Sequence, residues 1–114
     1  MQRNFWACAP VTLREVADRL RSSFGLVDPD FGSENSEEWF EGFASGAMNF
    51  YVCRAGGTTS PLRFIIKPYA TDPADLGRRL ASCLGQPVSY GEVSYLGDKK
   101  YSFEEFSRYE EKSG

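Results

Sequence analysis

The chain has 114 residues, of which 41% are hydrophobic and 25% charged, with 16 acids against 13 Lys or Arg side chains and no His. A length and balance of this kind predict one folded domain over residues 1–114. The aromatic content (nine Phe, six Tyr and two Trp) supplies enough apolar area for a packed core, which excludes a disordered chain.

Targeting and redox signals point to an intracellular protein. No apolar run approaches the roughly 18 residues of a membrane helix, so we expect no membrane contact. Residues 1–10 lack the hydrophobic region of a secretory signal, which favours a cytoplasmic location. The three cysteines, Cys8, Cys53 and Cys83, are widely spaced and outside any C-x-x-C motif. They are predicted to be reduced and buried, without a disulfide or zinc.

Two helices are the strongest local signals. Thr12 and Glu15 form a capping box after a predicted strand at 3–9, and Gly25 provides a stop. Apolar residues recur between them at helical spacing. A second helix is predicted from the N-cap Asp72, with proline at the first helical position, to residue 84. The apolar positions of the first helix are Leu13, Val16, Ala17, Leu20 and Phe24.

Strand signals lie between and after the helices. Residues 48–54 and 62–67 are rich in β-branched and aromatic side chains and are predicted to form a hairpin with its tip at 55–61. Residues 88–90 and 93–96 are predicted as one or two short strands, with a bulge at Gly91. A capping-box pattern, Ser-x-x-Glu, predicts a short C-terminal helix from residue 102.

The stretch from residue 26 to 46 fits a strand or a helix, and strand is favoured. Because each helix has one apolar stripe, each is expected to cover a sheet on one side only. The predicted fold is therefore a two-layer α+β sandwich, with an antiparallel or mixed sheet covered on one face by two helices. Without residues 26–46 and the C-terminal helix, the order is β-α-β-β-α-β, the ferredoxin-like order.

The absence of His removes Ser-His and Cys-His nucleophile pairs and imidazole metal ligands, so we predict no enzyme, no metal site and no cofactor. An acidic chain without a basic stripe is not expected to bind nucleic acid. Tyrosines could serve in stacking or protein contact if they share an exposed face, but tyrosine in strands is more often sheet packing. The tyrosines considered are Tyr51, Tyr69, Tyr90, Tyr95 and Tyr101.

Charge is distributed unevenly. Residues 22–53 contain six acids and no base, which leaves ten acids and thirteen bases elsewhere. Four aromatic residues (Phe31, Trp39, Phe40 and Phe43) lie among these acids. A negative field with aromatic anchors suits a basic protein partner. The opposing interpretation is that the aromatics face inward and the acids solubilise a loop. The predicted partner-binding residues are Asp28, Asp30, Glu34, Glu37, Glu38, Trp39 and Glu41.

The chain resembles the small cytoplasmic immunity proteins that bacteria pair with contact-dependent or other polymorphic toxins. The resemblance is architectural: one short α+β domain, an acidic balance, no catalytic motif, and the acidic aromatic stretch ENSEEW at residues 34–39. It implies one-to-one binding of a cognate toxin, often a basic nuclease. In such a complex, acidic side chains of the immunity protein mimic phosphates and block the active site of the toxin. It also implies a monomer or weak dimer without catalytic activity.

Two other functions remain open. Small acidic type III secretion chaperones have a roughly α-β-β-β-α-β-β-α order, from which the strand at 3–9 departs. A small-ligand-binding regulatory domain of ferredoxin-like shape is the other alternative. A dimer with apolar grooves would favour the chaperone, and a deep pocket would favour ligand binding or an enzyme.

Overall fold

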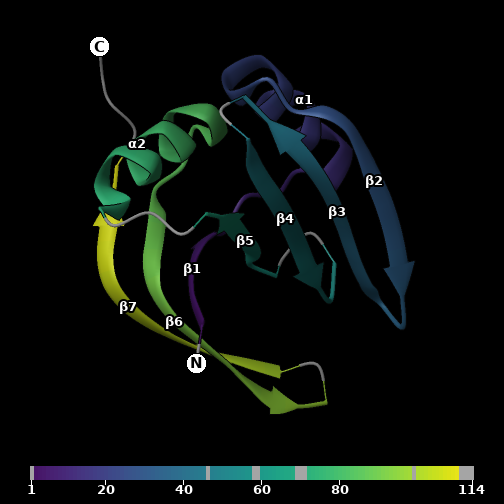
Figure 1. The fold of residues 1–114 in the computed structure, drawn as a ribbon. Coiled ribbons are helices and arrows are strands. Elements are labelled where there is room, and N and C mark those ends of the chain that lie inside the picture. Colours follow the sequence, from purple (N-terminus) through teal and green to yellow (C-terminus); the bar gives the residue numbers. More distant parts are fainter. Residues whose placement is uncertain (1, 46, 58–59, 69–71, 99, 111–114) are drawn as a thin grey trace.

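The computed structural model describes residues 2–45, 47–57, 60–68, 72–98 and 100–110. Within this part of the chain, seven strands and two helices follow one another (Figure 1). They are β1 (Gln2–Ala7), α1 (Leu13–Phe24), β2 (Val27–Glu34), β3 (Glu37–Ala44), β4 (Met48–Ala55), β5 (Leu62–Lys67), α2 (Pro73–Leu84), β6 (Val88–Gly97) and β7 (Lys100–Tyr109).

All seven strands form one antiparallel sheet in the order β2-β3-β4-β5-β1-β6-β7. Figure 1 shows α1 and α2 side by side on one face. The predicted α+β class and antiparallel sheet are thus confirmed. The ferredoxin-like expectation describes only the central strands β4-β5-β1-β6 and the helices. The sheet is much larger, because β2 and β3 extend one edge and β7 extends the other.

Both helices begin and end where their caps predict. The Thr12 hydroxyl accepts a hydrogen bond from the Glu15 N–H at 3.2 Å, and Asp72 accepts one from the Ala74 N–H at 3.0 Å. Gly25 adopts a left-handed φ of 71° and donates its N–H to the carbonyl of Arg21. Such caps satisfy orphan backbone groups locally, so tertiary contacts are not needed to place them.

Residues 27–34 and 37–44 form two strands, so the preference for strand over helix is confirmed. β2 and β3 are joined at Asn35 and Ser36, which both have positive φ (50° and 68°) and make the tight turn. The bulge predicted at Gly91 is also confirmed, because the β6–β7 register shifts between Tyr90 and Gly91. Residues 88–97 are one strand across that bulge.

The predicted C-terminal helix is wrong. Residues 100–109 form β7, which pairs with β6 along its length. The capping-box pattern is overridden because Phe103 lies opposite Val93 and its ring centroid is 5.1 Å from that of Trp6. Burying aromatic area against the sheet outweighs the small intrinsic preference of a short helix.

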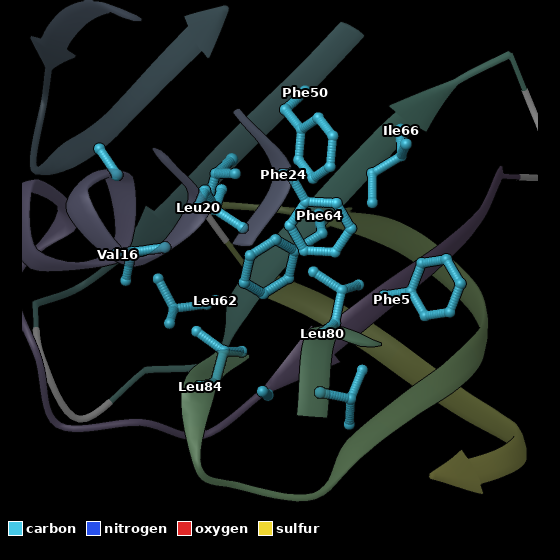
Figure 2. Close-up of a cluster of buried hydrophobic side chains, with 14 of the residues drawn as sticks. Phe5, Val16, Leu20, Phe24, Phe50, Leu62, Phe64, Ile66, Leu80 and Leu84 are labelled. Carbon is cyan, nitrogen blue, oxygen red and sulfur yellow. The ribbon is translucent and has the colours of Figure 1, made fainter. Parts of the chain in front are cut away.

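The core lies between the helices and the sheet. Figure 2 shows side chains from α1 and α2 interleaved with side chains of the central strands, and the rings of Phe24 and Phe50 lie 5.1 Å apart. Alternate residues of each strand enter this core, so the intervening residues point to the opposite face. That opposite face is called the open face below. The labelled core residues are Phe5, Val16, Leu20, Phe24, Phe50, Leu62, Phe64, Ile66, Leu80 and Leu84.

One charged side chain is inside the helix layer. Arg54 at the end of β4 is fully buried and donates to the carbonyls of Ala9 and Val11, both at 2.7 Å. Burial lowers the pKa of Arg54, with the carboxylate of Glu38 acting in the opposite direction. Arg54 therefore holds the β1–α1 connection against the sheet.

The β6–β7 hairpin curves strongly, and its far end bends away from α2 (Figure 1). At the bend, the backbone of Gly91 approaches that of Glu104 so closely that an added Cβ would lie 1.9 Å from the Glu104 carbonyl oxygen. Only glycine fits there without a clash. The bend brings Tyr101 of β7 to Glu37 of β3, although four strands separate β3 from β7 in the sheet. The open face is therefore concave at this end.

Candidate functional site

The acids of the predicted binding segment lie on the β2–β3 hairpin. Phe40, Gly42 and Ala44 are buried towards the helices, so the odd-numbered residues of β3 face the open side. The strand register then places the acids of β2 beside those of β3. Four of the predicted acids share the open face: Asp30, Glu34, Glu37 and Glu41.

These acids form two like-charged pairs. Glu34 lies directly opposite Glu37, and Asp30 lies directly opposite Glu41. Like charges in this arrangement destabilise a sheet, by on the order of 0.5 kcal/mol a pair. Across β2, β3 and β4, which are described in full, the only base is Arg54, and it points into the helix layer. The field of the β2–β3 open face is therefore negative.

Apolar side chains lie between and beside the acid pairs. Trp39 is half-buried on the open face, opposite Gly32, whose missing side chain leaves room for the indole. Phe43 and Val27 lie opposite each other and are 63% and 61% exposed. We call the four acids with Trp39, Phe43 and Val27 the acidic face.

The other two aromatics of the segment do not join this face. Phe40 is fully buried in the core, and Phe31 lies on the helix side under the Arg14 guanidinium, 4.8 Å from it. Trp39 and Phe43 therefore face outward, as binding of a partner would require, whereas Phe40 faces inward, as the opposing interpretation expected.

Two predicted site residues lie apart from the acidic face. Glu38 points to the helix side, where its Oε1 is 4.0 Å from Nη1 of Arg54. Asp28 is exposed with a φ of 41° in the irregular stretch where the β2–β3 register shifts. The sequence grouped them with the other acids because strand alternation and the bulge were not visible from charge counting.

A pocket of about 170 Å³ lies at the concave end of the open face. The Tyr101 hydroxyl donates to Oε1 of Glu37 at 2.9 Å, and the Arg63 guanidinium lies over the Tyr101 ring at 4.4 Å from its centroid. Arg63 and Cys53 are cross-strand partners on β5 and β4. Phe103 and Ser60 complete the principal walls.

Burial governs the acid–base properties of this pocket. It raises the pKa of the Cys53 thiol and of the Tyr101 hydroxyl, and the hydrogen bond to Glu37 raises the pKa of Tyr101 further. Burial also raises the pKa of the Tyr51 hydroxyl, which lies outside the pocket lining. A thiol in this state is a weak nucleophile. The raised pKa keeps Cys53 in its protonated form at neutral pH.

A pH effect follows from these raised pKa values. The folded state holds these protons more tightly than the unfolded state, so the protonated groups stabilise the fold. Their full contribution to the free energy of unfolding is present below the pKa values of the unfolded chain, about 8.5 for Cys and 10 for Tyr. This contribution is lost as pH rises through the pKa values of the folded state. Urea unfolding at increasing alkaline pH should show this loss, with a shallower slope for Tyr101→Phe. Equal slopes for the variant and the unmodified chain would contradict the assigned role of Tyr101.

Sequence reasoning did not find this pocket. Arg63 and Cys53 carried no motif, and Tyr101 was one of five tyrosines. Tyr51, Tyr95 and Tyr101 have side chains on the open side, with the rings of Tyr95 and Tyr101 5.3 Å apart. Tyr90 instead packs on Phe5 at the core, and Tyr69 lies outside the described residues. The sequence predicted a hairpin of residues 48–54 and 62–67, but the pairing of Arg63 with Cys53 depends on the exact register of β4 with β5.

The cysteines are free, as predicted, but they differ in burial. Cys53 is buried, Cys83 is half-buried and Cys8 is exposed, so the prediction of burial is wrong for Cys8.

Among the described residues, no three Cys, Asp or Glu side chains lie close enough together to form a metal site. No described helix combines the length and apolar character needed to cross a bilayer. Comparison with family models, curated proteins and solved structures found no match to the chain.

Proposed function

We propose that the acidic face binds a basic protein domain and that the chain is an immunity protein that neutralises a cognate toxin. The observation that carries this proposal is the pairing of acids: Glu34 with Glu37 and Asp30 with Glu41, on both sides of Trp39. These pairs weaken the isolated sheet. Lys or Arg side chains of a partner would remove the repulsion and turn it into attraction.

The apolar residues give the face a means of holding a partner after encounter. Steering by opposite charge raises the association rate, while buried aromatic side chains contribute most to affinity. Phe43 and Val27 supply an exposed apolar patch beside the Asp30–Glu41 pair, and Trp39 presents its ring between the two pairs. A domain with a basic rim and an apolar centre complements this pattern.

The chain would neutralise the toxin by binding the basic residues that the toxin uses to hold its substrate. In a nuclease-type toxin, Lys and Arg side chains hold substrate phosphates. Carboxylates bound to the same side chains exclude the substrate. The proposal places the chain in the cytoplasm, where such a toxin acts, and requires no catalysis by the chain itself.

The chaperone alternative has less support. Its order has no strand before the first helix, whereas β1 precedes α1 in this chain. The exposed Phe43 and Val27 form one cross-strand pair beside the Asp30–Glu41 pair rather than an extended apolar surface. We therefore retain the immunity function as the proposal.

Site-specific crosslinking tests the proposal. A photoreactive phenylalanine at Phe43 should capture one basic protein in the source cells, and the same group at Ser22, exposed on α1, should not. The purified basic domain should lose its toxic activity when mixed with the chain at a one-to-one ratio. Equal capture at both positions, or a captured domain whose activity is unaffected, would contradict the proposed function.

A further inference from the structure

The pocket at the concave end of the open face has features that the proposed function does not require. Its volume of about 170 Å³ is close to that of an engineered cavity of about 150 Å³ that binds benzene. It therefore has room for a ligand of about six heavy atoms. Its walls come from β3, β4, β5 and β7, together with the loop at Ser60 and Pro61.

One wall carries a positive charge without an acidic partner. No acid of the described chain lies within 4.0 Å of the Arg63 guanidinium. Its Nε is buried and has no hydrogen-bond acceptor among the described residues. Contact with the Tyr101 ring, whose centroid is 4.4 Å from Cζ of Arg63, holds the guanidinium at the pocket wall. A guanidinium held in this way can bind a carboxylate through two parallel hydrogen bonds.

Another wall carries a negative charge. The Glu37 carboxylate accepts one hydrogen bond, from Tyr101, and no cation of the described chain lies within 4.0 Å of it. Tyr101 contacts both charged groups, since its hydroxyl bonds Glu37 and its ring lies under Arg63. The two opposite charges are therefore held by one aromatic side chain at the same pocket.

We propose that this pocket binds a small α-amino acid as its zwitterion, with the carboxylate on Arg63 and the ammonium on Glu37. A simple anion would meet repulsion from Glu37, and a simple cation would meet repulsion from Arg63. A zwitterion satisfies both charges and remains neutral overall, so it does not leave an unpaired charge in a partly desolvated site. The rings of Tyr101 and Phe103 limit the ligand side chain to a few atoms.

The test is a titration of the isolated chain followed by NMR. L-Alanine should bind saturably, with a Kd on the order of 1 mM for a ligand of this size. L-Lactate, in which a hydroxyl replaces the ammonium, and isopropylamine, which lacks the carboxylate, should each bind at least about tenfold more weakly. L-Phenylalanine should not fit.

Variants assign the site. Glu37→Gln and Arg63→Lys should weaken L-alanine binding about tenfold or more, because each removes one charged contact or its paired geometry. Glu15→Gln, the same change at an exposed position of α1 outside the pocket and the acidic face, should leave binding unchanged. Absence of saturable shifts with L-alanine, equal binding of L-lactate, or an equal effect of Glu15→Gln would overturn the inference. The partner assays above are separate, so failure of one proposal does not imply failure of the other.

Discussion

Replacing Arg54 by Met is expected to lower the free energy of unfolding by about 3 kcal/mol. The buried guanidinium donates to the carbonyls of Ala9 and Val11, each at 2.7 Å. Met fills a similar volume but leaves the Val11 carbonyl without the Arg54 donor and leaves the Ala9 carbonyl with only the Val11 N–H, at 2.9 Å. The loss of two hydrogen bonds to these acceptors, rather than loss of charge, sets the size of this effect.

Urea unfolding of Arg54→Met at neutral pH measures this change. Arg108→Met is the matched control, because Arg108 is exposed and its ion pair with Glu110, at 3.4 Å, is solvated. The control should cost less than about 0.5 kcal/mol. Similar losses in the two variants would show that Arg54 does not anchor the β1–α1 connection.

Gly91→Ala is expected to destabilise the chain by about 3 kcal/mol, at the upper end of the range for overpacking. The added Cβ would lie 1.9 Å from the carbonyl oxygen of Glu104, and backbone cannot yield as a flexible side chain can. Relief of the clash straightens the β6–β7 hairpin. The Tyr101–Glu37 hydrogen bond at its far end should then be lost.

Gly57→Ala separates this clash from ordinary glycine effects. A Cβ at Gly57 meets no atom within 4 Å, but the residue has a φ of 91°. The control should therefore cost about 1 kcal/mol through backbone strain alone. Thermal unfolding and the Tyr101 NMR signals report the two variants. An unperturbed Tyr101 signal in Gly91→Ala would contradict the role assigned to the bend.

Local signals predicted the helices well. Thr12, Asp72 and Gly25 determine where α1 and α2 begin or end through contacts within a few residues, so no knowledge of the sheet is needed. The C-terminal strand could not be predicted in this way. Its Ser-x-x-Glu pattern is local, whereas the contact of Phe103 with Trp6 joins residues nearly a chain length apart.

The four acids and Trp39 of the acidic face were among the predicted site residues, but Phe43 and Val27 were not, and the geometry of the face could not be predicted. Charge counting identified Asp30 and Glu41 as candidates, yet only the register shows that they lie opposite each other. The same register separates Glu38 from them by placing it on the helix side near Arg54. The pocket formed by Glu37 and Tyr101 depends on the curvature at Gly91, which has no signal beyond one glycine in a strand.

The most direct test of the acidic face is the salt dependence of partner affinity for the double variant Asp30→Lys and Glu41→Lys. The partner is the basic domain captured through position 43. Asp18→Lys, on the exposed side of α1, is the control for charge alone. We predict that the double variant lowers affinity for the partner at least about 100-fold at low salt and makes the affinity less dependent on salt. The control variant should lower affinity about threefold or less. Unchanged affinity and an unchanged salt slope in the double variant would contradict the proposed binding face.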